Sequence, residues 1–150
     1  MSVLEADKTT PSEVREDVFY AAEALHRQLR PKIPIDYAGY LGRMFDEGAH
    51  LAVLCDDKKR PRAVAVWRAH LTTYSGRRFY VDDLVAEEAN RGEGWGGKML
   101  TWLQDRAGAL DCDSFALESG THRVDAHGFY FKQGLAIRNF GFMKKLTERF

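Results

Sequence analysis

The residues of this chain best suited to chemistry form a glycine-rich stretch at 91–98, Arg-Gly-Glu-Gly-Trp-Gly-Gly-Lys. Its glycines lack a Cβ atom, so the backbone can approach a ligand closely. An amphipathic pattern follows, and a helix starting there would direct unpaired N–H groups and the positive end of its dipole into the stretch. This arrangement is suited to hold a phosphate or pyrophosphate group.

Three phosphate-binding patterns match these glycines, and the surrounding residues separate them. A P-loop, G-x-x-x-x-G-K, needs Ser or Thr next to hold Mg²⁺, but Met99 stands there and cannot bind a hard cation. A dinucleotide-binding loop, G-x-G-x-x-G, follows its strand directly and opens its domain, whereas a polar segment and more than half of the chain precede this stretch. Asp111 or Asp113 could supply the acidic residue that this loop requires, so the pattern is weakened and stays open.

The third pattern, R-x-x-G-x-G, is formed by Arg91, Gly94 and Gly96, and other segments strengthen it. Residues 125–135 match the motif A-x-x-F-Y-x-x-x-G-F, with Leu in place of the final Phe. In their order and spacing, the residues from about 81 to 146 resemble the GNAT family of N-acetyltransferases.

The resemblance implies acetyl-CoA as a co-substrate and direct attack of an amine on its thioester in a ternary complex. The pyrophosphate would rest on the glycine-rich loop, and the pantetheine arm would pair with the backbone of the preceding strand. The implied cofactor-binding residues are Leu84, Val85, Ala86, Arg91, Gly92, Glu93, Gly94, Trp95, Gly96, Gly97 and Lys98. No metal is expected, because His26 and His50 lack companion ligands at metal-binding spacing.

Catalysis of this reaction needs an acid for the departing thiolate and a base for the amine. Tyr130 occupies the Tyr position of the F-Y pair, where the family often places a phenol near the CoA sulfur, and we expect it to be the general acid. Asp82 and Asp83 are adjacent in an apolar strand and are therefore predicted to point to opposite faces, with Asp83 aligned to an acidic position in several GNAT subgroups. Glu118, at the end of the next strand, is a third candidate base, and a water chain without a dedicated base is the alternative.

The spacing of apolar and turn residues predicts the elements that position these groups. A weak strand near Val3 should be followed by two helices, three strands, a helix, a strand, a helix and two terminal strands. The clearest expected segments are 11–30, 34–47, 51–55, 63–67, 79–86, 99–110, 114–118, 125–135 and 140–146. Because the turns between the middle strands are too short for crossovers, we expect an α+β GNAT fold, with a mixed, mainly antiparallel sheet flanked by about four helices.

Length and composition favour one domain at 1–150. With 22 basic and 22 acidic residues, the chain has no net field that would attract nucleic acid or an anionic membrane. No apolar run approaches the roughly 20 residues of a membrane-spanning helix, and the N-terminus does not resemble a signal peptide, so a cytoplasmic location is expected. Cys55 and Cys112 lack the spacing of a metal site or a disulfide framework.

The acceptor stays open between small-molecule and peptide amines, and a homodimer is left open as well. Acidic strand residues suit a cationic amine, and Tyr37, Tyr40, Phe45 and Trp67 are expected to line an aromatic pocket near the second helix. Two other functions stay open. One is a GNAT-fold module that binds acetyl-CoA as a sensor or structural ligand without turnover, and the other is a Rossmann-like or P-loop-like nucleotide-binding protein.

Overall fold

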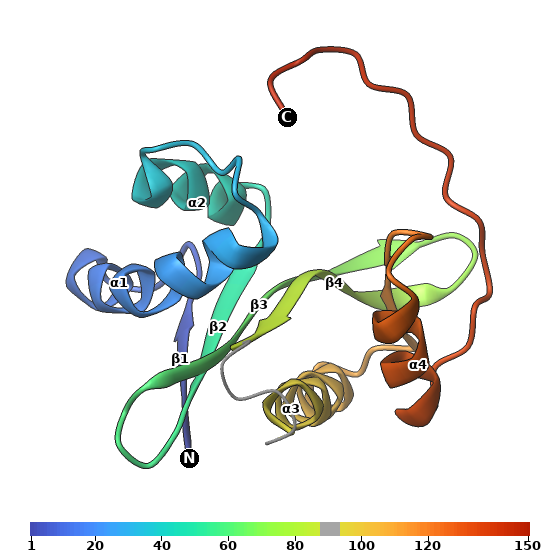
Figure 1. The fold of residues 1–150 in the computed structure, drawn as a ribbon, viewed down its shortest axis with the longest axis horizontal. Helices are drawn as coiled ribbons and strands as arrows, with labels where there is room; N and C mark the ends of the chain where they lie inside the picture. The colour runs from blue at the N-terminus through green and yellow to red at the C-terminus, as the bar shows by residue number, and fades with distance from the viewer. Residues whose placement is uncertain (88–93) are drawn as a thin grey trace. The chain divides into compact units, whose positions relative to one another are not determined.

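The computed structural model describes residues 1–87 and 94–150, which form two compact units, Met1–Ala116 and Leu117–Phe150. Figure 1 shows their elements along the chain. The expected ligand-binding residues Arg91, Gly92 and Glu93 lie outside the described residues.

A five-stranded open sheet organises the first unit, with the strands in the order in which they follow along the chain. The strands are β1 (Ser2–Ala6), β2 (His50–Cys55), β3 (Pro61–Thr72), β4 (Gly76–Ala86) and β5 (Ser114–Leu117). Each of the first three strands pairs antiparallel with the next. Helix α3 (Trp95–Ala109) connects β4 to β5 and is the kind of crossover that a parallel pair requires, so the sheet is mixed. The predicted α+β fold class is confirmed.

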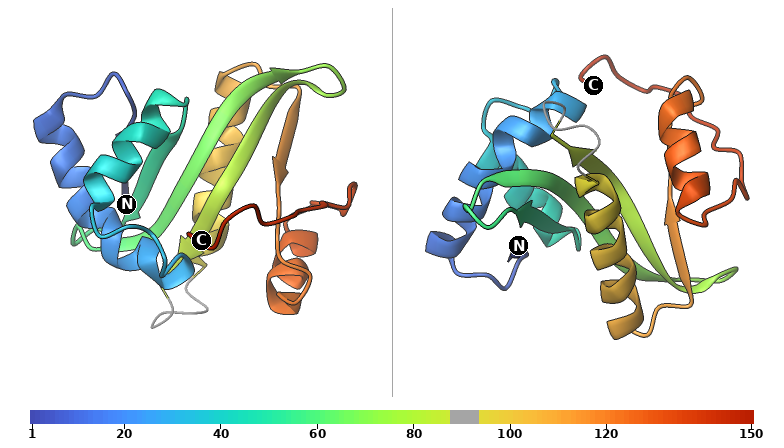
Figure 2. Two further views of the ribbon diagram at one scale, coloured as in Figure 1. Left: turned by 90° about the horizontal axis from the view of Figure 1, so that it is seen from above. Right: turned by 60° about the horizontal axis from the view of Figure 1, so that its bottom comes forward.

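Helices α1 (Ser12–Leu29) and α2 (Tyr37–Asp46) cover one face of this sheet, and α3 covers the other (Figure 2). The side chain of Asp36 caps the start of α2 by accepting a hydrogen bond from the Gly39 N–H, 2.9 Å away. The apolar stripes of α1 and α2 pack on alternate residues of β2 and β3. This core includes Val18, Ala22, Leu25, Leu41, Phe45, Leu51, Val53, Val64 and Val66. The side chains of β2 and β3 in this core therefore lie on the face of the sheet that α1 and α2 cover.

The second unit contains helix α4 (Val124–Lys132), and no helix or strand follows α4 in the described chain. The prediction of two terminal strands, the last at 140–146, is therefore wrong. The aromatic pattern of this segment suits a strand, but a strand also needs a hydrogen-bonded neighbour. Its large apolar side chains are exposed, including Ile137, Phe140, Phe142, Met143 and Leu146.

Candidate active site

The two adjacent aspartates of β4 lie at an irregularity in its pairing with β3. Val66 lies opposite Asp83, and the next residue, Trp67, lies opposite Val81. Asp82 is thus an extra residue on β4, which is the arrangement of a β-bulge. A bulge interrupts the regular alternation of side chains along a strand, so the faces of these aspartates follow from their contacts.

Asp83 is held from both sides by residues of α1. Its Oδ1 accepts a hydrogen bond from Arg30 Nε at 2.6 Å, and its Oδ2 lies 2.9 Å from His26 Nε2. Burial would raise the pKa of Asp83, but the hydrogen bond with His26 and the charge of Arg30 outweigh burial and leave this pKa below its usual value. Asp83 is therefore a carboxylate anion whose two oxygens are already engaged.

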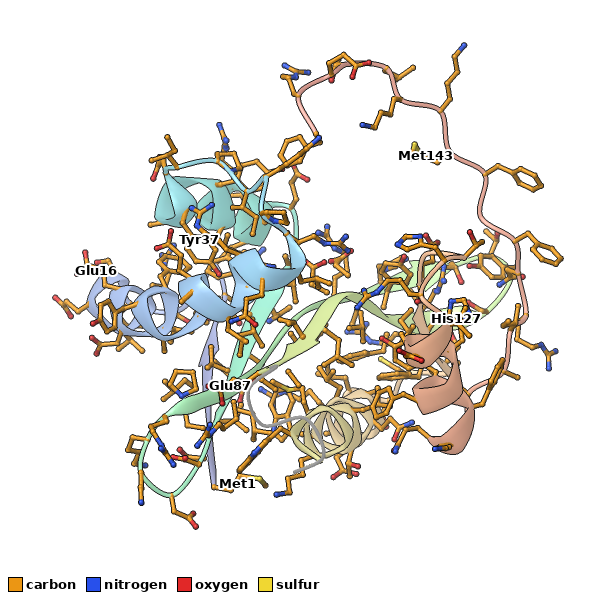
Figure 3. All side chains as sticks on the ribbon, in the orientation of Figure 1. Met1, Glu16, Tyr37, Glu87, His127 and Met143 are labelled. Atoms are coloured by element: carbon orange, nitrogen blue, oxygen red, sulfur yellow. The ribbon has the colours of Figure 1, made fainter. Side chains whose placement is uncertain are left out.

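A tyrosine completes this buried network. His26 Nδ1 lies 2.9 Å from the hydroxyl of Tyr37, the first residue of α2. If His26 carries its proton on Nε2, it donates to Asp83 and accepts from Tyr37, so each ring nitrogen has a matching partner. Burial raises the pKa of Tyr37, which keeps its hydroxyl a donor. Tyr37 is labelled beside α1 and α2 in Figure 3, and the network joins these helices to β4.

Asp82 has a more open environment on the same face of the sheet. Its Oδ2 accepts a hydrogen bond from Arg68 Nε at 2.7 Å, whereas its Oδ1 has no partner among the described residues. Burial raises the pKa of Asp82 above its usual value, although Arg68 opposes this shift. Arg68 also donates to the Glu47 carbonyl at the end of α2, 3.3 Å away, which places the pair on the face covered by α1 and α2. The expectation that Asp82 and Asp83 point to opposite faces is wrong, because the bulge cancels the alternation between them.

The described part of the glycine-rich loop leads into α3 through a left-handed residue. Gly94 has φ 74° and forms the N-cap of this helix, and its carbonyl accepts the first helical hydrogen bond from the Lys98 N–H at 2.9 Å. The N–H groups of Gly96 and Gly97, in the first helical turn, have no partner within the helix. The Lys98 ammonium lies 4.0 Å from the centre of the Trp95 ring. The start of α3 thus combines the N–H groups of Gly96 and Gly97 with the positive charge of Lys98.

The end of β4 next to this loop extends beyond the reach of β5. The Asp113 N–H, just before β5, donates to the Arg77 carbonyl at 2.8 Å, so β5 begins beside the start of β4. Four strand residues cover about 13 Å, whereas about 23 Å separates residue 77 from residue 84. On their other side, Leu84, Val85 and Ala86 pair with β3. Their edge toward β5 is therefore suited to pair with an extended ligand such as pantetheine.

A buried arginine at this end of β4 was not identified from the sequence. Arg62 Nε and Nη2 donate to Asp56 Oδ2 at 3.1 and 3.0 Å, and its Nη1 pairs with the carboxylate of Glu87. The Glu87 N–H also donates to the Arg62 carbonyl at 2.9 Å. Figure 3 labels Glu87, which directly follows β4. Arg62 thus fixes the residue from which the chain enters the glycine-rich loop, and no local pattern marks this role.

The other two catalytic candidates belong to the second unit. Glu118 directly follows β5, and Tyr130 lies on α4 with its ring centre 5.3 Å from that of Phe129. Burial raises the pKa of Tyr130, so its phenol is protonated at neutral pH. Its hydroxyl has no hydrogen-bond partner within the described chain.

The aromatic pocket expected near α2 is not present as such. Tyr37 and Phe45 are buried in the core on the α1 and α2 face. Trp67 is buried on the opposite face, where its ring is stacked between those of His50 and Phe79, at 4.0 and 4.5 Å. Tyr40 is partly buried and packs against the same core as Tyr37 and Phe45, so the four aromatic residues lie on two faces of the sheet and do not line one pocket.

The described chain contains neither a cluster of metal ligands nor a helix that could span a membrane. No three His, Cys, Asp or Glu side chains of residues 1–87 and 94–150 come close enough together to hold a metal ion. None of the helices described is both long and apolar enough to cross a membrane.

Comparison with known proteins identifies the family to which this chain belongs. The model of the acetyltransferase (GNAT) family matches residues 13–135. The chain therefore belongs to the GNAT acetyltransferase family, and acetyl transfer from acetyl-CoA is the general activity of this family. No curated protein matches the sequence.

Solved structures of acetyltransferases share the fold at low sequence identity. A ribosomal-protein-alanine N-acetyltransferase from Brucella melitensis biovar Abortus 2308 is 14% identical, with a TM-score of 0.76 over 97% of this chain and 100% of that one. An aminoglycoside N-acetyltransferase in complex with CoA is 12% identical, with a TM-score of 0.79 over 97% of this chain and 95% of that one. A glucosamine-6-phosphate N-acetyltransferase from Arabidopsis thaliana is 14% identical, with a TM-score of 0.70 over 98% and 100% of the two chains. At these identities the likeness shows the fold alone.

Proposed function

We propose that this chain, acting as one domain, transfers the acetyl group of acetyl-CoA to an amine by direct attack in a ternary complex. Membership of the GNAT family supports the acetyl donor. The antiparallel pairing of β1 to β4 argues against a Rossmann-like or P-loop-like protein, because those folds are built on a mostly parallel sheet.

The observation that carries this proposal is the junction between β4 and α3. Left-handed Gly94 opens the first turn of α3, whose N–H groups suit the pyrophosphate, and the nearby edge at Leu84, Val85 and Ala86 suits the pantetheine arm. Bound acetyl-CoA would supply an acetyl group activated as a thioester. Since the loop follows Ala86, the pantetheine arm would extend from Ala86 toward Leu84, and its thioester end would lie near the bulge at Asp82.

We infer that Asp82 is the carboxylate that receives the proton of the amine. Its Oδ1 is unpaired within the described chain, whereas both oxygens of Asp83 are engaged. Burial raises the pKa of Asp82, which makes this carboxylate a stronger base than an ordinary aspartate. Asp83 would instead fix the position of β4 against α1.

Tyr130 remains our proposed general acid, because a buried phenol keeps its proton at neutral pH and can donate it to a thiolate. Glu118 remains the alternative base. Both proposals rest on the family motif and on the order of the segments, because both residues belong to the second unit.

Acetyl-CoA binding and thiol release with a panel of amines test this function. Calorimetry should detect acetyl-CoA binding, and Gly94→Ala should weaken it about tenfold, because a left-handed backbone costs a residue with a side chain about 1–3 kcal/mol. The matched control is Gly108→Ala in the same helix, where φ is not positive and an added Cβ meets no atom within 4 Å. Binding without thiol release from any amine would favour the sensor, and ATP or NAD binding in place of acetyl-CoA would overturn the proposal.

A further inference from the structure

Two arginines converge on Asp82 from different elements. Arg30, the C-cap of α1, has its Nη2 3.4 Å from the Asp82 carbonyl, and Arg68 of β3 has its Nε 2.7 Å from the Asp82 carboxylate. Both guanidinium groups therefore contact the same residue, at the point where the thioester is proposed to end.

These guanidinium groups are more accessible to solvent than the Asp83 carboxylate, which lies deepest. The Arg30 side chain is 53% exposed, whereas Asp83, its ion-pair partner, is 11% exposed. Arg68 and Asp82 are about equally exposed, at 26% and 25%. A molecule approaching this face from solvent therefore meets two cations and one carboxylate.

Each guanidinium also has hydrogen-bonding capacity to spare. A guanidinium group carries five N–H donors. Among the described residues, Arg30 Nη1 and Arg68 Nη2 have no partner, and the contacts of Arg30 Nη2 and Arg68 Nη1 are long, at 3.4 and 3.3 Å. Paired arginines with free donors favour a carboxylate or a phosphate, since the planar N–H fork matches these anions.

We propose that the acceptor carries an anionic group, a carboxylate or a phosphate, which Arg30 and Arg68 bind while its amine lies beside Asp82. This inference rests on the proposed acetyl transfer. It specifies the acceptor as a molecule with both an amine and an acid group, and it gives the two arginines the role of selecting it.

Matched acceptor pairs test the inference through kcat/KM in the thiol-release assay. Alanine is compared with alaninamide to test for a carboxylate, and glucosamine 6-phosphate with glucosamine to test for a phosphate. In at least one pair the anionic member should be preferred about 10- to 100-fold, the range of a hydrogen bond to a charged group. Arg30→Gln and Arg68→Gln should each reduce that preference about tenfold and act mainly on KM for the acceptor. Arg30→Lys should retain part of it.

Arg106→Gln provides the matched control. Arg106 also forms an ion pair at the surface, with Glu5, but it lies on α3 and on the other face of the sheet. This variant should keep the full preference. The inference would be overturned if neutral acceptors had the same kcat/KM as anionic ones. It would also be overturned if the preference for the anionic acceptor were unchanged in both Arg30→Gln and Arg68→Gln.

Calorimetry with the CoA-loaded protein separates this inference from the proposed function. If no acceptor releases thiol, acetyl transfer fails, but the arginine pair is still tested by binding of the same compounds. Anionic members should bind to the wild type at least about tenfold more tightly than neutral ones and lose this advantage in Arg30→Gln. Equal binding of both members would overturn the inference even where transfer occurs.

Discussion

Asp82 and Asp83 are neighbours in the sequence, yet their surroundings give them different chemistry. Asp83 is buried against His26 and Arg30, and its pKa lies below the usual value, because these partners outweigh burial. The carboxylate of Asp82 has one hydrogen-bond partner among the described residues, Arg68, and burial raises its pKa. At the scale of the residue, one carboxylate is suited to hold structure and the other to exchange a proton.

Replacement of each aspartate by Asn should separate these roles. Asp82→Asn should lower kcat/KM for the amine about 10²- to 10⁴-fold, because the amide cannot accept the proton, while acetyl-CoA binding is retained. Asp83→Asn should lower the free energy of unfolding by about 1–3 kcal/mol, because charged hydrogen bonds are lost, with a smaller kinetic effect. Steady-state kinetics and urea unfolding measure the two. If the two variants show the opposite effects, Asp83 is the base. If neither variant changes the kinetics with the amine, Glu118 is the next candidate.

Tyr130→Phe keeps the ring and removes only the proton donor. We expect kcat to fall about 10²- to 10³-fold, with little change in acetyl-CoA affinity, because a general acid acts on the leaving thiolate and not on binding. A thiol-release assay measures kcat, and calorimetry measures the affinity for acetyl-CoA. Tyr20→Phe is the control, since Tyr20 is exposed on α1 and has no proposed role. A turnover rate equal to that of the wild type would leave Tyr130 with a packing role only.

At the scale of the element, the order of helices and strands as far as α4 could be predicted because apolar periodicity is local, whereas the two terminal strands expected after it are not formed. The β-bulge could not be predicted, because residues 79–86 taken together suit a strand and only the pairing with β3 shows that Asp82 is extra. The partners of Asp83 were equally hidden, since His26 and Arg30 lie 57 and 53 residues away along the chain. The candidate carboxylates could thus be named from the sequence, but their faces and charges depended on distant residues.

The junction between β4 and the glycine-rich loop should depend on Arg62. Arg62→Gln removes the charge that holds Glu87, so the end of β4 should become less well positioned and KM for acetyl-CoA should rise about tenfold, the effect of about 1.4 kcal/mol. KM for the amine should change little, as initial-rate kinetics with each substrate varied will show.

Arg60→Gln is the control for this prediction, because Arg60 pairs with the same Asp56 from a more exposed position. It should leave KM for acetyl-CoA within about twofold. A lower melting temperature of Arg62→Gln with an unchanged KM for acetyl-CoA would reduce Arg62 to a structural residue.

At the scale of the whole chain, stability should decline on the acid side of neutrality. Burial lowers the pKa of His50, so the unfolded chain takes up this proton more readily, and stability is lost as the pH falls below about 6.5. The pKa of Asp83 lies below its unfolded value, so its contribution is present above about pH 4 and is lost below it. Asp82, with a raised pKa, acts in the opposite direction.

Urea unfolding followed by circular dichroism at pH 7.5 and 5.5 measures this dependence. The midpoint should be lower at pH 5.5, and His50→Gln should reduce the difference between the two pH values, because it removes the group that titrates in this range. His122→Gln, in the second unit, is the control. If the difference in unfolding midpoint between pH 7.5 and 5.5 is the same in the wild type and in His50→Gln, other groups cause the loss of stability at acid pH.

Trypsin should cleave the segment 135–150 well before it cleaves the buried sites of the sheet. This segment contains Arg138, Lys144, Lys145 and Arg149, it forms no helix or strand, and its apolar side chains are exposed, so its backbone can enter a protease without unfolding the rest. Mass spectrometry of a time course should show cleavage there well before cleavage at Arg62, which is buried in β3. Protection of 138–149 equal to that of Arg62 would show that the segment is covered in solution. Protection that increases with protein concentration would identify the cover as a second copy of the chain, whereas protection independent of concentration would assign it to the same chain.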